Sequence, residues 1–555
     1  MGGASGLRIG NRTLAGHVTH RLTYRRPPET RGTAGGLWPV AVVGAGPIGL
    51  AAAIDLATHG VRSVVLDDDD DVAQGSRAIC WAKRSLEILD RLGVGERMRN
   101  KGVTWRIGRT YHRDRELFSV DLQPEPGHAM PAFVNLQQYY VEAFMLDRCA
   151  DFPELIEFRC KNRVVGVGQN ADTVTLSVDT PDGAYELDAS FVLACDGARS
   201  SLRTLLGLEL EGTGFEERFL IADVRLHDPM PAERRFWFEP TFHAGQSALL
   251  HKQPEDVYRI DLQLGADADP ETERQPEAVR PRIRAVVGDR PFSLEWISIY
   301  SFQCRRLQRF VHGRIVFAGD SAHVVSPFGA RGGNGGIQDV DNLVWKLALV
   351  LANEAPGALL TSYDEERSRA ADENLRQATA STHFMTPKTT HERRYRDAVL
   401  DLAAIARFAQ PLVNGGRLST PCALRGLSLQ TPAVDVVEGG LMPGDPCVDA
   451  PVGDGDNAWL LPHLGHHFKL LRIPSADDEL APIRIDDATG GETVALDDDQ
   501  GLVRTRYGRG VTYLVRPDQH VAARFVEPDR ATIDAAIRRA TANDAGARDK
   551  PSRKK

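Results

Sequence analysis

The hydrophobic pattern becomes regular at Pro39. The run PVAVV, residues 39–43, is continuous and apolar, as expected of a short buried strand, and IGLAAAIDLATHG after it has the composition of a helix that ends at Gly60. The next apolar run, VRSVVLD, predicts a second strand. Strand, helix and strand within about 30 residues predict a βαβ unit.

Two β-rich blocks follow. Segments at 157–178 and 185–194, separated by the turn signal Pro181-Asp182-Gly183, predict strands that return to the first sheet. The second block, from about Phe219 to Tyr300, contains RFWFEP, SALLHK, VYRIDLQL and LEWISIYSF. These runs predict a separate sheet, which we assign to a second domain.

The last part of the chain changes from helical to mixed patterning. Residues from about 342 to 406 have helical composition, including VWKLALVLA and SYDEERSRAADENLRQATAS. Farther on, TYLVRPDQHVAARF predicts strand, turn and strand before a final helix at 530–541. We therefore expect a separate C-terminal α/β domain at residues 435–542.

Length and composition narrow the class of protein. A chain of 555 residues predicts two or three domains, and its net charge of -9 disfavours nucleic acid or an anionic membrane as a partner. No apolar run reaches the ~18–20 residues that span a bilayer. The seven cysteines are scattered without metal-ligand spacing, which favours a cytoplasmic location and no metal site. Residues 1–37 and the basic residues 543–555 are expected to be disordered tails.

Glycines at the first strand-to-helix turn indicate a phosphate site. In GAGPIG, Gly44 permits a tight turn, Gly46 lets the backbone approach a pyrophosphate, and Gly49 lets the helix pack on the strand. The N–H groups at the helix start can bind a diphosphate. Asp67 follows the second strand, where its carboxylate can accept hydrogen bonds from a ribose with a free 2′-hydroxyl. The predicted dinucleotide contacts are Gly44, Gly46, Pro47, Ile48 and Asp67.

A second glycine-rich segment lies far along the chain, at residues 319–347. It reads GDSAHVVSPFGARGGNGGIQDVDNLVWKL and follows the predicted strand RIVFAG, so an acidic residue, a glycine-rich loop and a long helix from about Gly336 come in succession. Paired with GAGPIG, this segment resembles the class A flavoprotein monooxygenases, the aromatic-ring hydroxylases. Residues from about 441 to 524 resemble the thioredoxin-like C-terminal domain of phenol hydroxylase and hydroxyphenylpropionate hydroxylase relatives, without a cysteine pair.

The resemblance implies a fold and a set of FAD contacts. The fold is α/β: a Rossmann-like FAD-binding domain at 38–215 and 302–415, an inserted β-sheet substrate domain at 216–301, and the thioredoxin-like domain at 435–542. Further implied contacts with FAD are Arg77, Gln138, Asp196, Gly197, Asp320, Pro327, Gly332, Gly333 and Asn334. Gln137 would take the place of Gln138 if the register of this helix slips by one residue.

The same resemblance implies the chemistry. FAD would be reduced by NADH or NADPH, which binds transiently because the chain has only one GxGxxG, and would transfer oxygen from O2 to a phenolic substrate through a flavin C4a-hydroperoxide. A helix N-terminus near Gly333 and Asn334 would stabilise negative charge on the reduced flavin. His323 is expected to support the motif rather than to catalyse, and Arg331 either adds charge near the flavin or faces solvent.

Candidates for substrate contact lie on the predicted second sheet. We assign Tyr300, His251 and Tyr258 to substrate binding or to handling of the phenol proton, with His243 and Trp296 as further candidates. Two alternatives of the same fold are a monooxygenase that removes nitro groups from nitrophenols or nitrocatechols and one that tailors polyketide-type phenols. An alternative of another class is a flavoprotein that sequesters an aromatic compound with little turnover. A homodimer is left open.

Overall fold

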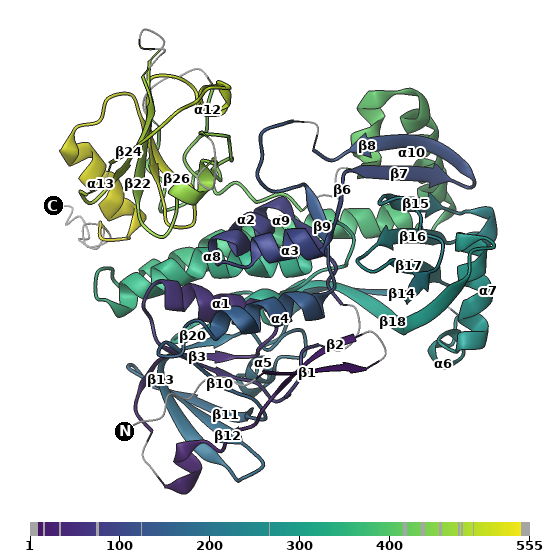
Figure 1. The fold of residues 1–555 in the computed structure, drawn as a ribbon, viewed down its shortest axis with the longest axis horizontal. Coiled ribbons are helices and arrows are strands. Elements are labelled where there is room, and N and C mark those ends of the chain that lie inside the picture. Colours follow the sequence, from purple (N-terminus) through teal and green to yellow (C-terminus); the bar gives the residue numbers. More distant parts are fainter. Residues whose placement is uncertain are drawn as a thin grey trace, which may run out of the picture.

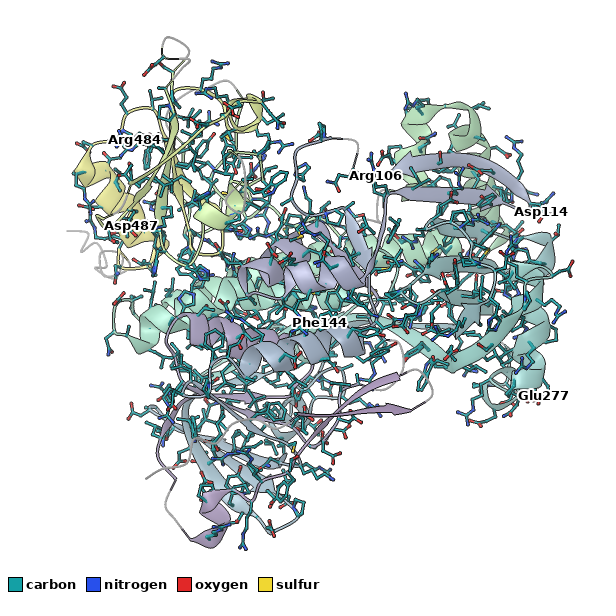
Figure 2. The ribbon with its side chains drawn as sticks, viewed as in Figure 1. Arg106, Asp114, Phe144, Glu277, Arg484 and Asp487 are labelled. Carbon is teal, nitrogen blue, oxygen red and sulfur yellow. The ribbon has the colours of Figure 1, made fainter. Side chains whose placement is uncertain are left out.

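The structure is a computed structural model that describes residues 9–14, 17–32, 35–73, 77–123, 125–265, 267–414, 419–433, 439–453, 458–475, 478, 481–491 and 493–544. Two large sheets and a smaller C-terminal domain are separated by a layer of helices (Figure 1). Figure 2 shows Asp114 and Glu277 at the outer edge of the molecule, whereas the label of Phe144, on α4, lies near the middle of the view.

The first sheet confirms the predicted βαβ unit. Strands β3 (Trp38–Val43) and β4 (Ser63–Leu66) are parallel neighbours joined by α1 (Pro47–Thr58). The order is β10-β4-β3-β13-β12-β11, with β20 also beside β13. The remaining strands are β10 (Ile156–Arg159), β11 (Arg163–Gln169), β12 (Val174–Asp179), β13 (Tyr185–Ala194), β19 (Val311–His312) and β20 (Ile315–Phe317).

Helices cover this sheet on the side that faces the rest of the molecule (Figure 1). Helix α1 packs between α4 (Gln138–Cys149) and α8 (Gly332–Leu351), and α2 (Lys83–Arg91) lies on α8. A small sheet of β5 (Cys80–Ala82), β9 (Phe133–Asn135) and β6 (Val103–Trp105) adjoins them. Short helices at α3 (Gly95–Lys101) and α5 (Ser201–Leu205) complete this part.

The second sheet is larger than the sequence predicts. Its order is β21-β18-β14-β17-β16-β15-β7-β8. The predicted block 216–301 supplies most of it, but β14 begins at Glu211, β18 ends at Arg306, and a distant hairpin adds two strands. The strands are β7 (Ile107–His112), β8 (Arg115–Asp121), β14 (Glu211–Leu226), β15 (Arg234–Phe238), β16 (Ser247–Lys252), β17 (Val257–Leu264), β18 (Phe292–Arg306) and β21 (His323–Val324).

Each face of the second sheet packs against different helices because side chains alternate along a strand. One face, with Leu220, Tyr258 and Ile260, packs on α7 (Pro276–Val287), which follows α6 (Pro270–Glu273). The other face, with Phe219 and Phe236, packs on α9 (Leu359–Met385) and α10 (Thr390–Ile405), which leads to α11 (Gln410–Asn414).

The C-terminal domain is an α/β unit that contacts the helical layer. Its sheet has the order β24-β23-β22-β25-β26, and the pairings that the structure describes are all antiparallel. The strands are β22 (Lys469–Ile473), β23 (Ile483–Asp487), β24 (Thr493–Leu496), β25 (Val511–Val515) and β26 (Val521–Phe525), with α12 (Leu502–Tyr507) and α13 (Arg530–Ala540). The predicted last helix is confirmed to within one residue.

The N-terminal prediction is wrong for the residues that the structure describes. Strands β1 (Ile9–Leu14) and β2 (His17–Leu22) form an antiparallel hairpin, and a 3₁₀ turn follows at Pro28–Arg31. Glu29 accepts hydrogen bonds from Arg159 at 3.1 Å, and the Leu22 N–H donates to the Asp70 carbonyl at 2.8 Å. Polar contacts with distant residues fix this segment, so apolar periodicity could not reveal it. Residues 1–8 and the predicted basic tail from 545 lie outside the described part.

Candidate active site

A cavity of about 1460 Å³ is lined by residues of both large sheets and of the helical layer. Every predicted cofactor residue lies in its wall, although these residues come from segments far apart in the chain. They are Gly44, Gly46, Pro47, Ile48, Asp67, Arg77, Gln138, Asp196, Gly197, Asp320, Pro327, Gly332, Gly333 and Asn334. The fold therefore brings the two predicted glycine-rich segments together.

The first glycine turn has the shape that a pyrophosphate requires. Gly44 has a φ of 102°, and a Cβ there would lie 2.5 Å from the Cys195 carbonyl oxygen. A Cβ on Gly49 would lie 1.8 Å from the Gly44 carbonyl oxygen, so only glycine lets α1 start here. Around Gly46, by contrast, a Cβ would meet no atom within 4 Å. The space beside Gly46 is open cavity at the start of a helix, where an anion is stabilised.

Asp67 is positioned to receive hydroxyl donors. Its Oδ2 accepts a hydrogen bond from the Ala45 N–H at 2.5 Å, and its Oδ1 accepts from the Asp69 N–H at 2.8 Å. Burial raises the pKa of Asp67 to about 6. Ribose hydroxyls donating to this carboxylate would stabilise its charged form.

The loop that carries Arg77 is held by the start of α4. Gln138 accepts from the Ala78 N–H at 3.1 Å and donates to Glu142 at 2.8 Å, while Glu142 accepts from the Ala73 N–H at 2.6 Å. Gln138 lines the cavity, and Gln137 is not among the lining residues. Gln138 rather than Gln137 is therefore the glutamine on the cavity side.

Asp196 has one oxygen committed and one free for a ligand. Its Oδ2 accepts from the Leu202 N–H at 3.0 Å and from the Ser201 hydroxyl at 3.2 Å, which anchors α5. Its Oδ1 is buried in the cavity wall and has no hydrogen-bond partner among the described residues. A buried acceptor without a partner fits a bound hydroxyl group.

The second glycine segment starts its helix earlier than predicted. Helix α8 begins at Gly332 rather than near Gly336, and the first helical hydrogen bond runs from the Gly335 N–H to the Arg331 carbonyl at 2.8 Å. The N–H groups of Gly332, Gly333 and Asn334 precede that bond and have no partner within the helix. They lie at the cavity, so the positive end of α8 faces it.

The side chains around this helix start are structural. Asn334 accepts from the Ala82 N–H at 2.9 Å and donates to the Cys80 carbonyl at 2.9 Å, which ties β5 to α8. Arg331 is buried in the cavity wall and donates to Asn374 at 2.9 Å. Of the two expectations for Arg331, exposure to solvent is therefore wrong.

His323 supports the motif, as predicted. It lies 2.6 Å from Asp339 of α8, and Asp339 also accepts from the Gly319 N–H at 2.9 Å and from Arg367 at 2.7 Å. Burial alone would raise the pKa of Asp339, but the charges of His323 and Arg367 hold it below its usual range. This cluster fixes the turn that carries Asp320.

The second sheet forms the other wall of the cavity. Tyr300, on β18, pairs with Phe219 on β14, and both line the cavity. The ring of Phe219 packs against those of Phe302 and Phe328, each at 5.1 Å between centroids. Because Phe328 directly follows Pro327, this aromatic wall adjoins the loop predicted to border the flavin.

Two of the predicted substrate residues do not reach the cavity wall. Tyr258 packs on the α7 side of the sheet, where its hydroxyl donates to the Met230 carbonyl at 2.6 Å. His243 lies 2.6 Å from the Gln263 carbonyl oxygen and is not a lining residue. Tyr258 does not reach the cavity because side chains alternate along a strand, and its neighbour Arg259 is the one that lines the cavity.

Charged residues that the sequence analysis missed line this face. They are Arg234, Arg259 and Asp261. Alternation in VYRIDLQL is the signal that could have found two of them, since the third and fifth letters share a face. Arg259 donates to Asp223 at 3.1 Å and to the Arg77 carbonyl at 2.9 Å, so it joins the sheet to the Arg77 loop.

His251 lines the cavity between two guanidinium groups. It pairs across strands with Arg234 on one side and Arg259 on the other. Burial, and then the charges of these arginines, lower the pKa of His251 well below its ordinary value. The imidazole is therefore neutral at physiological pH. Among the described residues no group of acids, histidines and cysteines could hold a metal ion, and no helix could cross a membrane.

Comparisons with known proteins agree with this site. The model of the FAD binding domain family matches residues 38–378, more than half of the chain. A flavin-dependent monooxygenase of Mycobacteroides abscessus is 30% identical over 516 residues, covering 89% of this chain and 98% of that protein. The 12-dehydrotetracycline 5-monooxygenase/anhydrotetracycline 6-monooxygenase of Streptomyces rimosus is 30% identical over 70% of this chain and 78% of that protein.

A solved structure shows the same fold. The flavin-dependent monooxygenase PieE, in complex with FAD and substrate, matches with a TM-score of 0.76 at 21% identity, over 91% of this chain and 99% of that one. The family match, the relatives and the glycine-lined cavity agree, and the predicted resemblance is confirmed. The chain belongs to the FAD binding domain family and is an FAD-dependent monooxygenase of the class A type.

Proposed function

We propose that the protein hydroxylates a phenolic aromatic compound, with FAD at the glycine-lined end of the cavity and the arene on the second sheet. The observation that carries the proposal is one continuous cavity whose wall contains both sets of residues. When bound, FAD supplies the activation of O2 and the transfer of an oxygen atom. The chain itself binds and orients the FAD and the arene, and it excludes water from them.

Residues along the cavity would orient the FAD. The Gly46 turn and Asp67 would hold the diphosphate and ribose, and Asp196 and Asp320 would accept hydrogen bonds from hydroxyl groups of the cofactor. The N–H groups at the start of α8 would stabilise negative charge on the flavin ring. The wall of Phe219, Phe302 and Phe328 keeps water from the reacting ring.

The phenol proton has two proposed acceptors. Tyr300 lines the cavity next to the aromatic wall, and His251 lines it as a neutral imidazole, so each can accept a hydrogen bond from the phenol, while burial and the two arginines keep the pKa of His251 low and disfavour full transfer of the proton to it. Ionisation of a phenol raises the electron density of its ring and favours attack by an electrophilic oxygen. Tyr258 lies on the other face of the sheet and cannot contact a substrate in this cavity.

The reductant is proposed to be NADH or NADPH, bound transiently. The test is anaerobic stopped-flow reduction of the FAD-loaded protein by each nucleotide, with and without a panel of phenols. Reduction that one phenol accelerates, followed after mixing with O2 by a hydroxylated product, supports the proposal. Reduction that no phenol changes, with hydrogen peroxide as the only oxygen product, contradicts it, whereas binding of a phenol without consumption of either nucleotide favours the sequestering alternative.

A matched pair of glycine variants tests the cofactor end. Gly46→Val points a side chain into open cavity and should leave a folded protein depleted of FAD. Gly49→Val collides with the Gly44 carbonyl and should reduce folding itself. Circular dichroism and the FAD content per chain separate the two. Full FAD occupancy in folded Gly46→Val would reject the placement.

The products distinguish the substrate alternatives of the same fold. The Streptomyces rimosus relative, whose name gives 12-dehydrotetracycline and anhydrotetracycline as its substrates, favours a polyketide-type phenol as the second candidate. Nitrite release from a nitrophenol would instead support the denitrating reaction. Mass spectrometry of products from phenols, nitrophenols and polycyclic phenols separates the three.

We also propose a structural role for the C-terminal domain, which we assign to the thioredoxin-like type. Cys447 is the only cysteine within 435–542. Burial raises the pKa of its thiol to about 12, so the reactive thiolate is scarce. We therefore do not propose thiol–disulfide exchange for this domain. Its proposed role is structural, through contacts with α8 and α9. A cytoplasmic location is the accompanying expectation, and a homodimer is left open.

A further inference from the structure

The strand order of the first sheet sets the direction of FAD along the cavity. Strands β10, β4, β3, β13 and β20 are parallel neighbours in this order, so the segments that follow them meet at one edge of the sheet. The cavity residues on these segments are, in the same order, Asn162, Asp67, Gly44, Asp196 and Asp320. Because Asp320 lies beside the start of α8, where the flavin ring would be stabilised, the adenosine half of FAD would lie at the opposite end, toward β10.

Leu22, in the segment before the first sheet, contributes an apolar side chain to this end of the cavity. It is 6% exposed, and its backbone N–H donates to the carbonyl of Asp70, in the loop that follows Asp67, at 2.8 Å. Adenine is a flat ring whose two faces are largely apolar, so contact with apolar side chains removes that surface from water. The other apolar residues that line the cavity here and pack in the same core are Val72, Leu146, Phe158 and Val164.

A buried ion pair holds the same segment a few residues farther on. Both carboxylate oxygens of Glu29 accept from Arg159 of β10, each at 3.1 Å, and these side chains are only 7% and 5% exposed. Arg159 also donates to the Tyr185 hydroxyl at 3.0 Å, and this hydroxyl donates to Asn162 at 2.8 Å. Asn162 lines the cavity. The segment is therefore attached at two points, one in the cavity wall and one linked to that wall by hydrogen bonds.

We propose that residues 22–31, which we call the strap, cover the adenosine half of FAD and slow the release of the cofactor. The strap lies outside residues 38–378, which the family model matches, and it supplies none of the FAD contacts that the family resemblance implies. With Leu22 in the cavity wall, FAD would leave only after the strap detaches. Detachment is unfavourable because it breaks the buried, bidentate pair of Glu29 and Arg159. The inference depends on FAD and not on the identity of the substrate.

The test measures how fast FAD leaves the FAD-loaded protein. The holoenzyme is diluted, and the FAD that is still bound after increasing times is separated by gel filtration and measured by its absorbance. Leu22→Ala removes most of the apolar side chain at the adenosine end and should release FAD about 10-fold faster than the wild type. Leu22→Met keeps an apolar side chain of similar volume and should release FAD at nearly the wild-type rate.

The two carboxylate partners of Arg159 give a matched pair of variants for the second anchor. Glu29→Gln weakens the contact with the strap and should release FAD about 3- to 10-fold faster. Glu157 accepts from the same arginine at 2.7 Å, but it lies on β10 and is 44% exposed, so Glu157→Gln leaves the strap attached. Its release of FAD should stay within about twofold of the wild type. The visible circular dichroism of the bound flavin should be unchanged in every variant, because the strap lies at the other end of the cofactor.

Release at the wild-type rate from both Leu22→Ala and Glu29→Gln refutes the proposal. Equal acceleration in Glu29→Gln and Glu157→Gln assigns the effect to Arg159 itself and refutes an anchor in the strap. Faster release together with an altered flavin spectrum refutes a local effect at the adenosine end. If Leu22→Ala does not fold, the comparison of Glu29→Gln with Glu157→Gln decides alone. These measurements use no phenol, so an absence of hydroxylation contradicts only the proposed function.

Discussion

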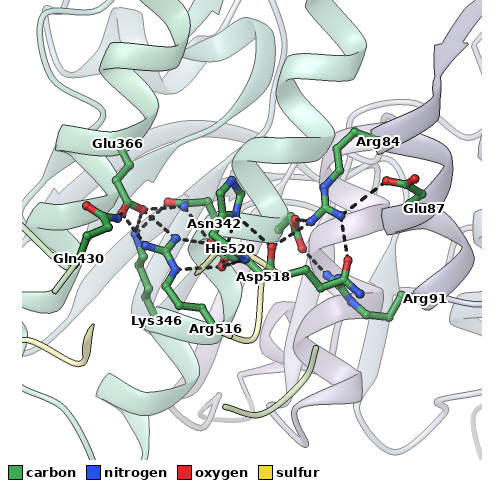
Figure 3. A network of polar contacts seen from close by, with 12 residues as sticks. Arg84, Glu87, Arg91, Asn342, Lys346, Glu366, Gln430, Arg516, Asp518 and His520 are labelled. Atoms are coloured by element: carbon green, nitrogen blue, oxygen red, sulfur yellow. Dashed lines mark hydrogen bonds and ion pairs between the residues drawn. The ribbon is translucent and has the colours of Figure 1, made fainter. Parts of the chain in front are cut away.

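Two groups of buried charges in this molecule differ in how fully they are paired. Between α8, α9 and the C-terminal domain, Glu366 accepts from Arg516 at 2.6 and 3.0 Å and from Lys346 at 2.7 Å (Figure 3). Asp518 accepts from the Arg516 Nε at 2.9 Å. On the second sheet, Arg234 and Asp261 are partly buried at the cavity, and each has one enclosed polar atom without a partner in the described structure.

The difference indicates what each group is for. A buried charge that is fully hydrogen-bonded within the chain has no capacity left for a ligand and holds elements together. The group around Glu366 joins two domains, since Arg516 and Asp518 come from the C-terminal domain and Glu366 from α9. A buried charge with unused capacity beside a cavity is the arrangement expected of a binding site.

Breaking the paired group should have the largest effect. Arg516→Met leaves Glu366 and Asp518 buried with less compensation, and we expect a loss of about 3–5 kcal/mol in the free energy of unfolding. Urea denaturation followed by circular dichroism measures it. Arg472→Met is the control, because Arg472 pairs with Asp486 at a partly exposed position of the same domain and should cost about 1 kcal/mol or less. Equal losses in the two variants would contradict the comparison.

Removing an unpaired charge should stabilise the protein, depending on pH. The folded-state pKa of Asp261 is about 6 against an ordinary 3.8, so the folded protein binds more protons between these values and its stability falls as the pH rises through this window. Asp261→Asn removes the free-energy cost of a charged carboxylate at this position, and the variant should be about 2–3 kcal/mol more stable than wild type at pH 8. At pH 4 the gain should be small.

Unfolding free energies of both proteins at pH 4 and pH 8 decide this prediction. A variant that is less stable than wild type at pH 8 would mean that Asp261 has a partner in solution. A gain of the same size at both pH values would show that the effect does not come from ionisation.

The smallest effect is expected for Arg234. Because Arg234 is only partly buried at the cavity and its guanidinium has no ion pair in the described structure, Arg234→Met should change the free energy of unfolding by no more than about 1 kcal/mol. The same denaturation experiment as for Arg516→Met measures it, with FAD content as the control for the site. A loss comparable to that of Arg516→Met would place Arg234 in the structural group.

The cofactor end of the site was predictable because its signals are local. GAGPIG and the GD segment each need particular glycines within a few residues, and the structure explains these by the φ of 102° at Gly44 and the contact between Gly49 and the Gly44 carbonyl. The start of α8 was placed four residues late because glycine is a poor helix former, and only tertiary contacts such as those of Asn334 reveal the helix there.

The substrate end was less predictable because it depends on strand parity and on long-range pairing. A shift of one residue on β17 separates Tyr258, which packs on α7, from Arg259, which lines the cavity. The hairpin β7–β8 joins the second sheet through a parallel pairing of β7 with β15, a contact that no local pattern encodes. The same holds for Glu29, whose partner Arg159 lies in another segment.

The central claim is that this one cavity holds both the flavin and the arene that is oxygenated. Turnover of the phenol panel with NADH or NADPH under isotopically labelled dioxygen, followed by mass spectrometry, tests it most directly. The account predicts a product that has gained one labelled oxygen atom on the ring, and loss of that product in Gly46→Val. Consumption of reductant that yields only hydrogen peroxide, with every phenol recovered unchanged, would contradict it.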